Sequence, residues 1–216
     1  MYKHQEENDN VMPVASECVL CNAVMDKGRN IENTRIIESS NYIMMPGLGD
    51  FLGGYSLIVS KNHIHSSAYL EKQQVDELEK FLKICEEFLF EYLGKNVISA
   101  EHGSVLSSEK GPACVNHLHF HLFPVDIRKE DVLGFFNSFD RIKSLGDTRK
   151  FSQNDIPYIL LKFPDGEIII RDAINIQKQF VRTIISKLTG KEDEWNWVIH
   201  ENLSNIRTFL KSIQRE

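Results

Sequence analysis

Several features that would restrict the protein to a membrane or to nucleic acid are missing from its sequence. The chain has no run of about twenty apolar residues, so it offers no membrane-spanning segment. Its polar start lacks the apolar core of a signal peptide. The net charge of −6 argues against broad, sequence-independent nucleic-acid binding, although it leaves room for a local basic pocket. We therefore expect a cytoplasmic protein that neither spans a membrane nor binds nucleic acid broadly.

Cysteine is scarce, with four in 216 residues, and in a reducing compartment we expect no disulfides. Cys18 and Cys21 form a Cys-x-x-Cys pair. Such a pair has three interpretations: a thioredoxin-like redox site, half a zinc site, or two buried thiols. The redox interpretation is disfavoured, because Asp26-Lys27-Gly28-Arg29-Asn30 interrupts the long helix that should follow the pair.

A phosphate-binding P-loop is also lacking. The glycine-rich segment 46–54 does not end in Gly-Lys-Ser/Thr, so it is not a Walker motif. We expect its glycines to let the backbone approach a ligand or another strand instead. The chain has no internal repeat and no low-complexity tract.

What the chain does contain is an alternation of histidine and apolar residues, Asn116-His117-Leu118-His119-Phe120-His121-Leu122-Phe123-Pro124. Alternation with period two predicts a half-buried strand with Leu118, Phe120 and Leu122 facing the core. The three histidines then share the opposite face. Imidazole attacks, transfers protons and binds metals near neutral pH, so this face is the candidate site.

Periodicity also predicts the main helices. A buried stripe at helical spacing indicates a long helix that is capped by Ser66 or Ser67 and ended by Gly94. Beyond Pro124 we expect a β-hairpin with Pro164-Asp165-Gly166 at its turn. The expected helices span 68–93, 131–143, 173–188 and 202–213.

The triad stretch resembles the signature of the histidine triad superfamily of nucleotide hydrolases and transferases, and the resemblance runs from about Cys18 to Pro124. It implies an α+β fold: a bent antiparallel sheet of about five strands with a long packed helix, followed by a C-terminal β-hairpin and helices. The implied organisation is a polar tail (1–15), a catalytic domain (16–126) and a C-terminal extension packed on it (127–216).

The resemblance assigns the chemistry to two of the histidines. His119 would attack the α-phosphorus of a nucleotide and form a nucleotidyl-histidine intermediate, and His121 would steady the charge or the leaving oxygen. The substrates implied are nucleoside phosphates or dinucleoside polyphosphates. Many members are dimers, so a homodimer is also implied unless the C-terminal extension blocks that contact.

The segments before the triad resemble one branch of this superfamily. Glu101-His102-Gly103, with Gly111 and Cys114, looks like a branch related to diadenosine polyphosphate hydrolases, which makes His102, Gly103 and Gly111 candidate substrate-binding residues. In place of a phosphate-binding glutamine the chain has Ala113.

Two further departures concern substrate binding. The chain has Val125 where an arginine is common, and no obvious acid for the ribose near Gly47. Arg182, on the predicted 173–188 helix beside Lys178, is a candidate replacement for the lost phosphate contacts. A solvated charged face is the competing interpretation.

The metal ligands are likewise implied by resemblance. From the residues alone, His63, His65, His102, His117, His119 and His121 all remain candidates to complete a site with Cys18 and Cys21. Zinc-bearing relatives join the Cys-x-x-Cys to the histidine of a Pro/Ser-Lys-x-His segment at the end of a strand and to the first triad histidine. In this chain those residues are Cys18, Cys21, His63 and His117, and they imply a structural zinc.

Two alternatives stay open. Histidines at i and i+2 on one strand can grip a catalytic metal, so a metal-dependent hydrolase could use His119 and His121 as ligands. A degenerate triad could instead bind nucleotide without turning it over.

Overall fold

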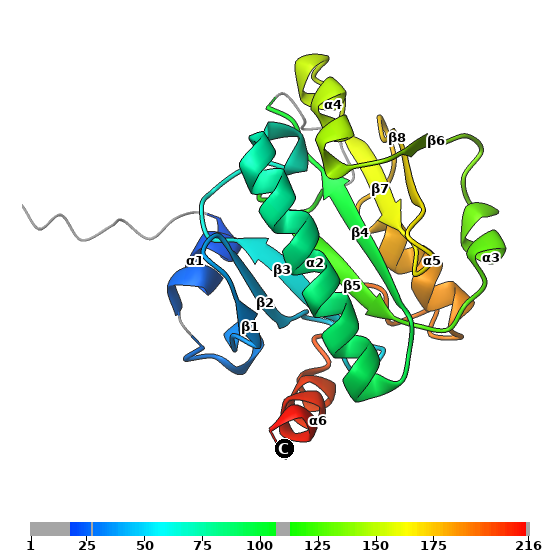
Figure 1. Cartoon of the computed structure of the whole chain (residues 1–216). Coiled ribbons are helices and arrows are strands. Elements are labelled where there is room, and N and C mark those ends of the chain that lie inside the picture. The colour runs from blue at the N-terminus through cyan, green and yellow to red at the C-terminus, as the bar shows by residue number, and fades with distance from the viewer. Residues whose placement is uncertain (1–17, 27, 107–112, 215–216) are drawn as a thin grey trace, which may run out of the picture.

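A computed structural model describes residues 18–26, 28–106 and 113–214. They form a single antiparallel sheet of eight strands with helices on both faces (Figure 1). The strand order is β1-β2-β3-β5-β4-β7-β8-β6. The strands are β1 (Ile37–Glu38), β2 (Tyr42–Pro46), β3 (Ser56–Ser60), β4 (Val97–Gly103), β5 (His119–Pro124), β6 (Asp140–Ile142), β7 (Tyr158–Lys162) and β8 (Ile168–Asp172). The α-helices are α1 (Val19–Asp26), α2 (Lys72–Leu93), α3 (Lys129–Leu133), α4 (Arg149–Gln153), α5 (Phe180–Leu188) and α6 (Leu203–Ile213).

The α+β class and the antiparallel sheet are confirmed, but the expected count of about five strands is too low. The predicted hairpin, β7 and β8, turns at Gly166 with a φ of 85°. It continues the same sheet, because β7 pairs with β4 from Ser99↔Lys162 to Gly103↔Tyr158. This pairing satisfies backbone groups that would otherwise lie at a sheet edge. The predicted tail, residues 1–15, lies outside the described residues.

Helix α2 covers one face of the sheet, in front of β5 and β4 in Figure 1. Its apolar stripe packs on Leu118, Phe120 and Leu122, as the alternation of the triad segment predicts. The helix starts at Lys72 rather than Ala68, and a Glu71–Gln74 capping box takes the place of the predicted serine cap. At its other end Gly94 adopts a φ of 64°, as predicted for a C-cap.

The opposite face is covered in two separate places. Near β2 and β3, Leu20 of α1 packs on Ile43, Met45 and Val59. Over β4, β7 and β8, helices α3 and α5 pack on a second apolar cluster. The stretch of β5 that carries His119 and His121 lies between these two covers. None of the helices in these described ranges has the length and apolarity needed to cross a membrane.

Two predicted C-terminal helices are much shorter than expected. The segment 131–143 is helical only to Leu133, and Asp140–Ile142 forms β6 against β8. The segment 173–188 becomes α-helical only at Phe180, because Gln179 takes a left-handed φ of 60°. The shared helix face proposed for Lys178 and Arg182 is therefore wrong, although the predicted 202–213 helix is confirmed as α6.

Candidate active site and metal centre

Four side chains from three distant segments converge beside the start of β5. Cys18 and Cys21 come from the α1 segment, His63 from the loop after β3, and His117 from the bend before β5. Their potential ligand atoms all lie within 4.8 Å of one another. Cys21 Sγ is 3.2 Å from His63 Nδ1, and both sulfurs are 3.4 Å from His117 Nδ1. The structure thus brings together the four residues singled out as metal ligands.

The donor set fits zinc. A tetrahedral site with Zn–S near 2.3 Å and Zn–N near 2.0 Å separates sulfur from nitrogen by about 3.5 Å, close to the distances found here. His117 Nε2 lies 2.8 Å from the Ser60 carbonyl and donates to it, so its Nδ1 lone pair points toward the thiols. Metal-bound histidines usually have such a second partner. Burial lowers the pKa of His117 to about 4, which keeps the ring in its ligating form.

His119 occupies the next position on the same face of β5. Its Nδ1 lies 2.6 Å from the His117 carbonyl, and only a protonated Nδ1 can make this contact as a donor. The lone pair of the neutral ring is therefore on Nε2. Burial lowers the pKa of His119, against the raising effect of its hydrogen bond to His117. A neutral ring with its proton held by the backbone is suited to nucleophilic attack.

His121 follows at the next position and packs edge-on against His119, with ring centroids 4.9 Å apart. Its Nδ1 lies 2.5 Å from the Tyr55 hydroxyl. Its Nε2 is buried and has no hydrogen-bond partner among the described residues. Burial lowers the pKa of His121 well below its ordinary value, and the charges of neighbouring His119, His102 and Arg182 act in the same direction. Both rings are thus neutral at physiological pH.

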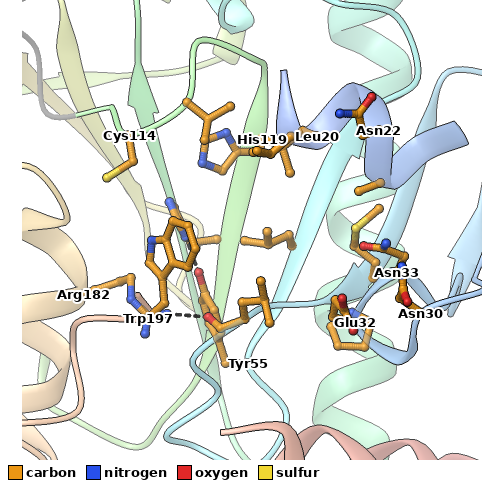
Figure 2. A pocket seen from close by; sticks show the side chains of 18 of the residues that line it. Leu20, Asn22, Asn30, Glu32, Asn33, Tyr55, Cys114, His119, Arg182 and Trp197 are labelled. Atoms are coloured by element: carbon orange, nitrogen blue, oxygen red, sulfur yellow. Dashed lines mark hydrogen bonds between the residues drawn. The ribbon is translucent and has the colours of Figure 1, made fainter. Parts of the chain in front are cut away.

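The two histidines open into a pocket of about 490 Å³, a size typical of small-molecule sites. Figure 2 shows its two ends: Arg182, Trp197 and Cys114 lie on one side, and Asn30, Glu32 and Asn33 lie on the other. Apolar side chains from α1, β2 and β3 line the pocket between these two ends. These are Leu20, Ala23, Met45 and Leu57.

The predicted substrate-binding residues do not all lie at the pocket. His102 lines the pocket and meets His121 edge-on at 5.3 Å, while its Nε2 accepts from the Val181 backbone at 3.4 Å. Gly103 faces the other side of the sheet, where an added Cβ would come within 2.1 Å of the Tyr158 ring. Gly111 lies outside the described residues.

Arg182 lines the pocket but is already engaged by the protein. Its Nε donates to the Trp195 carbonyl and its Nη2 to the Gly49 carbonyl, each at 2.8 Å. Only 1% of the residue is exposed. The solvated-face interpretation is therefore wrong, and the side chain acts first as a brace between α5 and the glycine-rich loop.

Three pocket residues carried no clear functional signal in the sequence. Tyr55 follows the glycine-rich loop, Gln179 precedes α5, and Trp197 lies in the segment before α6. The Gln179 side-chain oxygen is buried without a partner among the described residues. In the sequence, the glycines ahead of Tyr55 and the position of Gln179 beside Lys178 were the only indications, and neither specifies a pocket.

The model of a family described as proteins similar to the CwfJ C-terminal matches residues 5–136, more than half of the chain. No curated protein matches it.

Several solved structures are similar to the chain. A HIT family hydrolase from Clostridium thermocellum is 20% identical with a TM-score of 0.41, covering 53% of this chain and 96% of its own. A zinc-bound histidine triad family protein from Mycobacterium smegmatis is 20% identical, with a TM-score of 0.42 and coverages of 64% and 92%. A hypothetical histidine triad nucleotide-binding protein from Sulfolobus tokodaii is 17% identical, with a TM-score of 0.42 and coverages of 63% and 93%.

Proposed function

We propose that this chain, which belongs to the family of proteins similar to the CwfJ C-terminal, is a nucleotidyl hydrolase or transferase of histidine triad type. The observation that carries the proposal is the orientation of His119. Its Nδ1 proton is tied to the His117 carbonyl, its pKa is lowered, and its Nε2 is left to act at a pocket of nucleotide size.

The reaction has two displacements at the α-phosphorus. First, His119 Nε2 forms a bond to phosphorus while the bond to the leaving oxygen breaks, and His121 stabilises the charge on that oxygen. Next, water or another acceptor attacks phosphorus, the P–N bond breaks with its electron pair returning to His119 Nε2, and the acceptor passes its proton to solvent. His119 returns neutral, with its Nδ1–H still donated to the His117 carbonyl.

The shape of the pocket supports nucleoside phosphates or dinucleoside polyphosphates as substrates. The apolar middle, with Leu20, Met45 and Leu57, suits the flat face of a base. Asn30, Glu32 and Asn33 at the far end offer hydrogen-bonding groups for sugar or base edges. The phosphate chain would then reach the histidines, with Arg182 contributing positive potential beyond them.

The role proposed for the metal is structural. Zinc held by Cys18, Cys21, His63 and His117 would fasten the α1 segment, one wall of the pocket, to the strand that carries His119. The metal-dependent alternative is less well supported, because the one cluster of metal-ligand type found in the described residues includes neither His119 nor His121.

Trapping the covalent intermediate tests the proposal. The protein is mixed with diadenosine tetraphosphate labelled at its α-phosphates, acid-sensitive adducts are preserved by alkaline quench, and peptides are mapped by mass spectrometry. We expect adenylyl label on His119 and loss of turnover by at least about 10³-fold in His119→Ala. His65→Ala, which changes a histidine outside the pocket lining, is the matched control. Turnover without label on His119, or wild-type turnover by His119→Ala, would refute the covalent route.

A further inference from the structure

A row of three buried side chains links the C-terminal part of the molecule to the third triad histidine. The Arg182 guanidinium lies 4.7 Å from the centre of the Tyr55 ring, and the Tyr55 hydroxyl lies 2.5 Å from His121 Nδ1. Arg182 comes from α5, Tyr55 immediately precedes β3, and His121 lies on β5; none is more than 7% exposed. No pattern in the sequence connects them, and the proposed reaction assigns Tyr55 no role.

The protons in this row can be placed from its chemistry. Arginine has only donors, and the hydrogen bond from Arg182 to the phenol leaves the Tyr55 hydrogen to be donated elsewhere. Burial raises the pKa of Tyr55, and Arg182 only partly offsets this, so the phenol stays protonated at neutral pH. Within the described residues the acceptor in reach is His121 Nδ1. Nδ1 therefore carries the lone pair, and the hydrogen of the neutral ring is on Nε2.

The glycine-rich loop is shaped to hold this row in place. A Cβ on Gly47 would come within 2.1 Å of the Tyr55 ring. At Gly49, with a φ of 70°, a Cβ would meet Arg182 Nη2 at 2.7 Å and the Trp197 backbone at 2.8 Å. The buried Asp50 carboxylate orders the rest of the loop, accepting from the backbone nitrogens of residues 52–55 at 2.8–3.1 Å. The glycine-rich loop thus fixes the positions of Tyr55 and Arg182, and it does so without a phosphate-binding motif.

The surroundings of His121 leave its Nε2 hydrogen for a ligand. The ring faces Tyr55, His102, His119 and Arg182, and none of these accepts from Nε2. The Nε2 of His102 already accepts from Val181. A buried donor without a partner costs free energy, which makes it a candidate for a role with bound substrate.

We propose that Tyr55, braced by Arg182, is a positioning residue that fixes His121 with hydrogen on Nε2 and so makes it the donor to the departing group. This inference rests on the proposed function and deepens it. When the bond from phosphorus to the departing atom breaks, its electron pair goes to that atom, which takes the His121 Nε2 proton as the Tyr55 hydroxyl proton moves to Nδ1. The ring stays neutral, and the Tyr55 phenolate is left beside the Arg182 guanidinium. Solvent then returns a proton to Nε2, and the Nδ1 proton goes back to Tyr55.

The tautomer can be measured without any turnover. Nitrogen-15 spectra that correlate ring nitrogens with ring protons distinguish Nε2–H from Nδ1–H histidine. We expect His121 to show the Nε2–H pattern in the wild type and to lose it, in part or fully, in Tyr55→Phe. Tyr42→Phe is the matched control, because Tyr42 is equally buried but donates to the Gln74 carbonyl on the α2 face. An Nδ1–H pattern in the wild type, or an unchanged pattern in Tyr55→Phe, would overturn the proposal.

Kinetics with two leaving groups test the consequence. Adenosine monophosphate p-nitrophenyl ester needs no proton on its leaving group, whereas the alkylamide of the same nucleotide does. We expect Tyr55→Phe to lower kcat about 10- to 100-fold on the amide and less than about threefold on the ester, with KM nearly constant. Equal losses on both substrates would contradict a donor role. If the wild type turns over neither, the proposed function fails, while the spectra still decide the tautomer.

Discussion

The parts of the chain before and after residue 127 contribute to the same pocket in different ways. The first part carries every atom proposed to react or to bind metal, from Cys18 to His121. The second part carries none of these atoms. It supplies instead the opposite wall, with Gln179, Arg182 and Trp197, and three further strands of the same sheet.

This difference shows that the reacting residues lie close together in the sequence, whereas the residues that support them lie far from the groups they contact. The reacting histidines are neighbours on one strand, so a local alternation reveals them. Arg182 acts through carbonyls more than a hundred residues away, at Leu48 and Gly49, and through the ring of Tyr55. Such contacts exist only after the sheet has formed, and no local pattern reports them.

The largest effect is expected from breaking the metal cluster of the first part. In Cys21→Ala we expect loss of bound zinc and destabilisation by roughly 5 kcal/mol or more, because binding free energy of a structural zinc is folding free energy. Native mass spectrometry measures the zinc stoichiometry, and thermal unfolding measures stability. The wall formed by α1 should loosen with it, which would also raise KM.

Cys114→Ala is the control for this experiment. Cys114 lines the pocket but is not one of the four clustered residues, so its removal should leave zinc content unchanged. If Cys21→Ala retained one zinc per chain and unfolded at the wild-type temperature, the four residues would have no role as a metal centre.

A smaller effect is expected at the seam between the two parts. Glu101 on β4 is buried on the α2 side of the sheet and accepts from Ser67 at 2.6 Å and from Tyr158 of β7 at 2.8 Å. Burial raises the pKa of Glu101 to about 7, although these hydrogen bonds lower it. The folded protein therefore binds more protons than the unfolded chain between about pH 4.5 and 7.

The sign of the pH effect follows from this difference. The contribution of Glu101 is complete below the unfolded pKa and is lost as pH rises through the folded one, by on the order of 3 kcal/mol. Glu101→Gln should flatten this slope in urea unfolding measured from pH 4.5 to 8. Glu91→Gln, on the exposed side of α2, should keep the wild-type slope. An equally steep slope in Glu101→Gln would mean that the carboxylate is ionised throughout.

The first part of the fold was well predicted because its signals are periodic. The alternation around His119 gave the buried face of β5, and the stripe of α2 gave the longest helix. The cluster of Cys18, Cys21, His63 and His117 was named from a pattern of resemblance, and the structure brings these residues together. Even here, Ser67 was misassigned as a helix cap, because its hydroxyl binds Glu101, a long-range partner.

The second part was less predictable because its elements are short and depend on pairing. Residues Asp140–Ile142 became strand β6 only because β8 presents a free edge there. The left-handed Gln179 shortened the helix that was expected to begin at Ala173. Arg182 was named as a pocket residue, but its engagement by backbone carbonyls could not be read from spacing.

The smallest effect is expected from a substitution of Trp197. It tests whether the second part of the chain contacts the substrate or only supports the site. Trp197 lines the pocket beside Arg182 (Figure 2). Trp197→Leu should raise KM about fivefold, near 1 kcal/mol, with kcat almost unchanged, because stacking would bind ground and transition states equally. Trp195→Leu is the control, since its side chain is not part of the pocket lining. A fall in kcat at constant KM would mean that the indole acts on the chemical step. If neither constant changed, the brace through Arg182 and Tyr55 would remain as the link of the second part to the reaction.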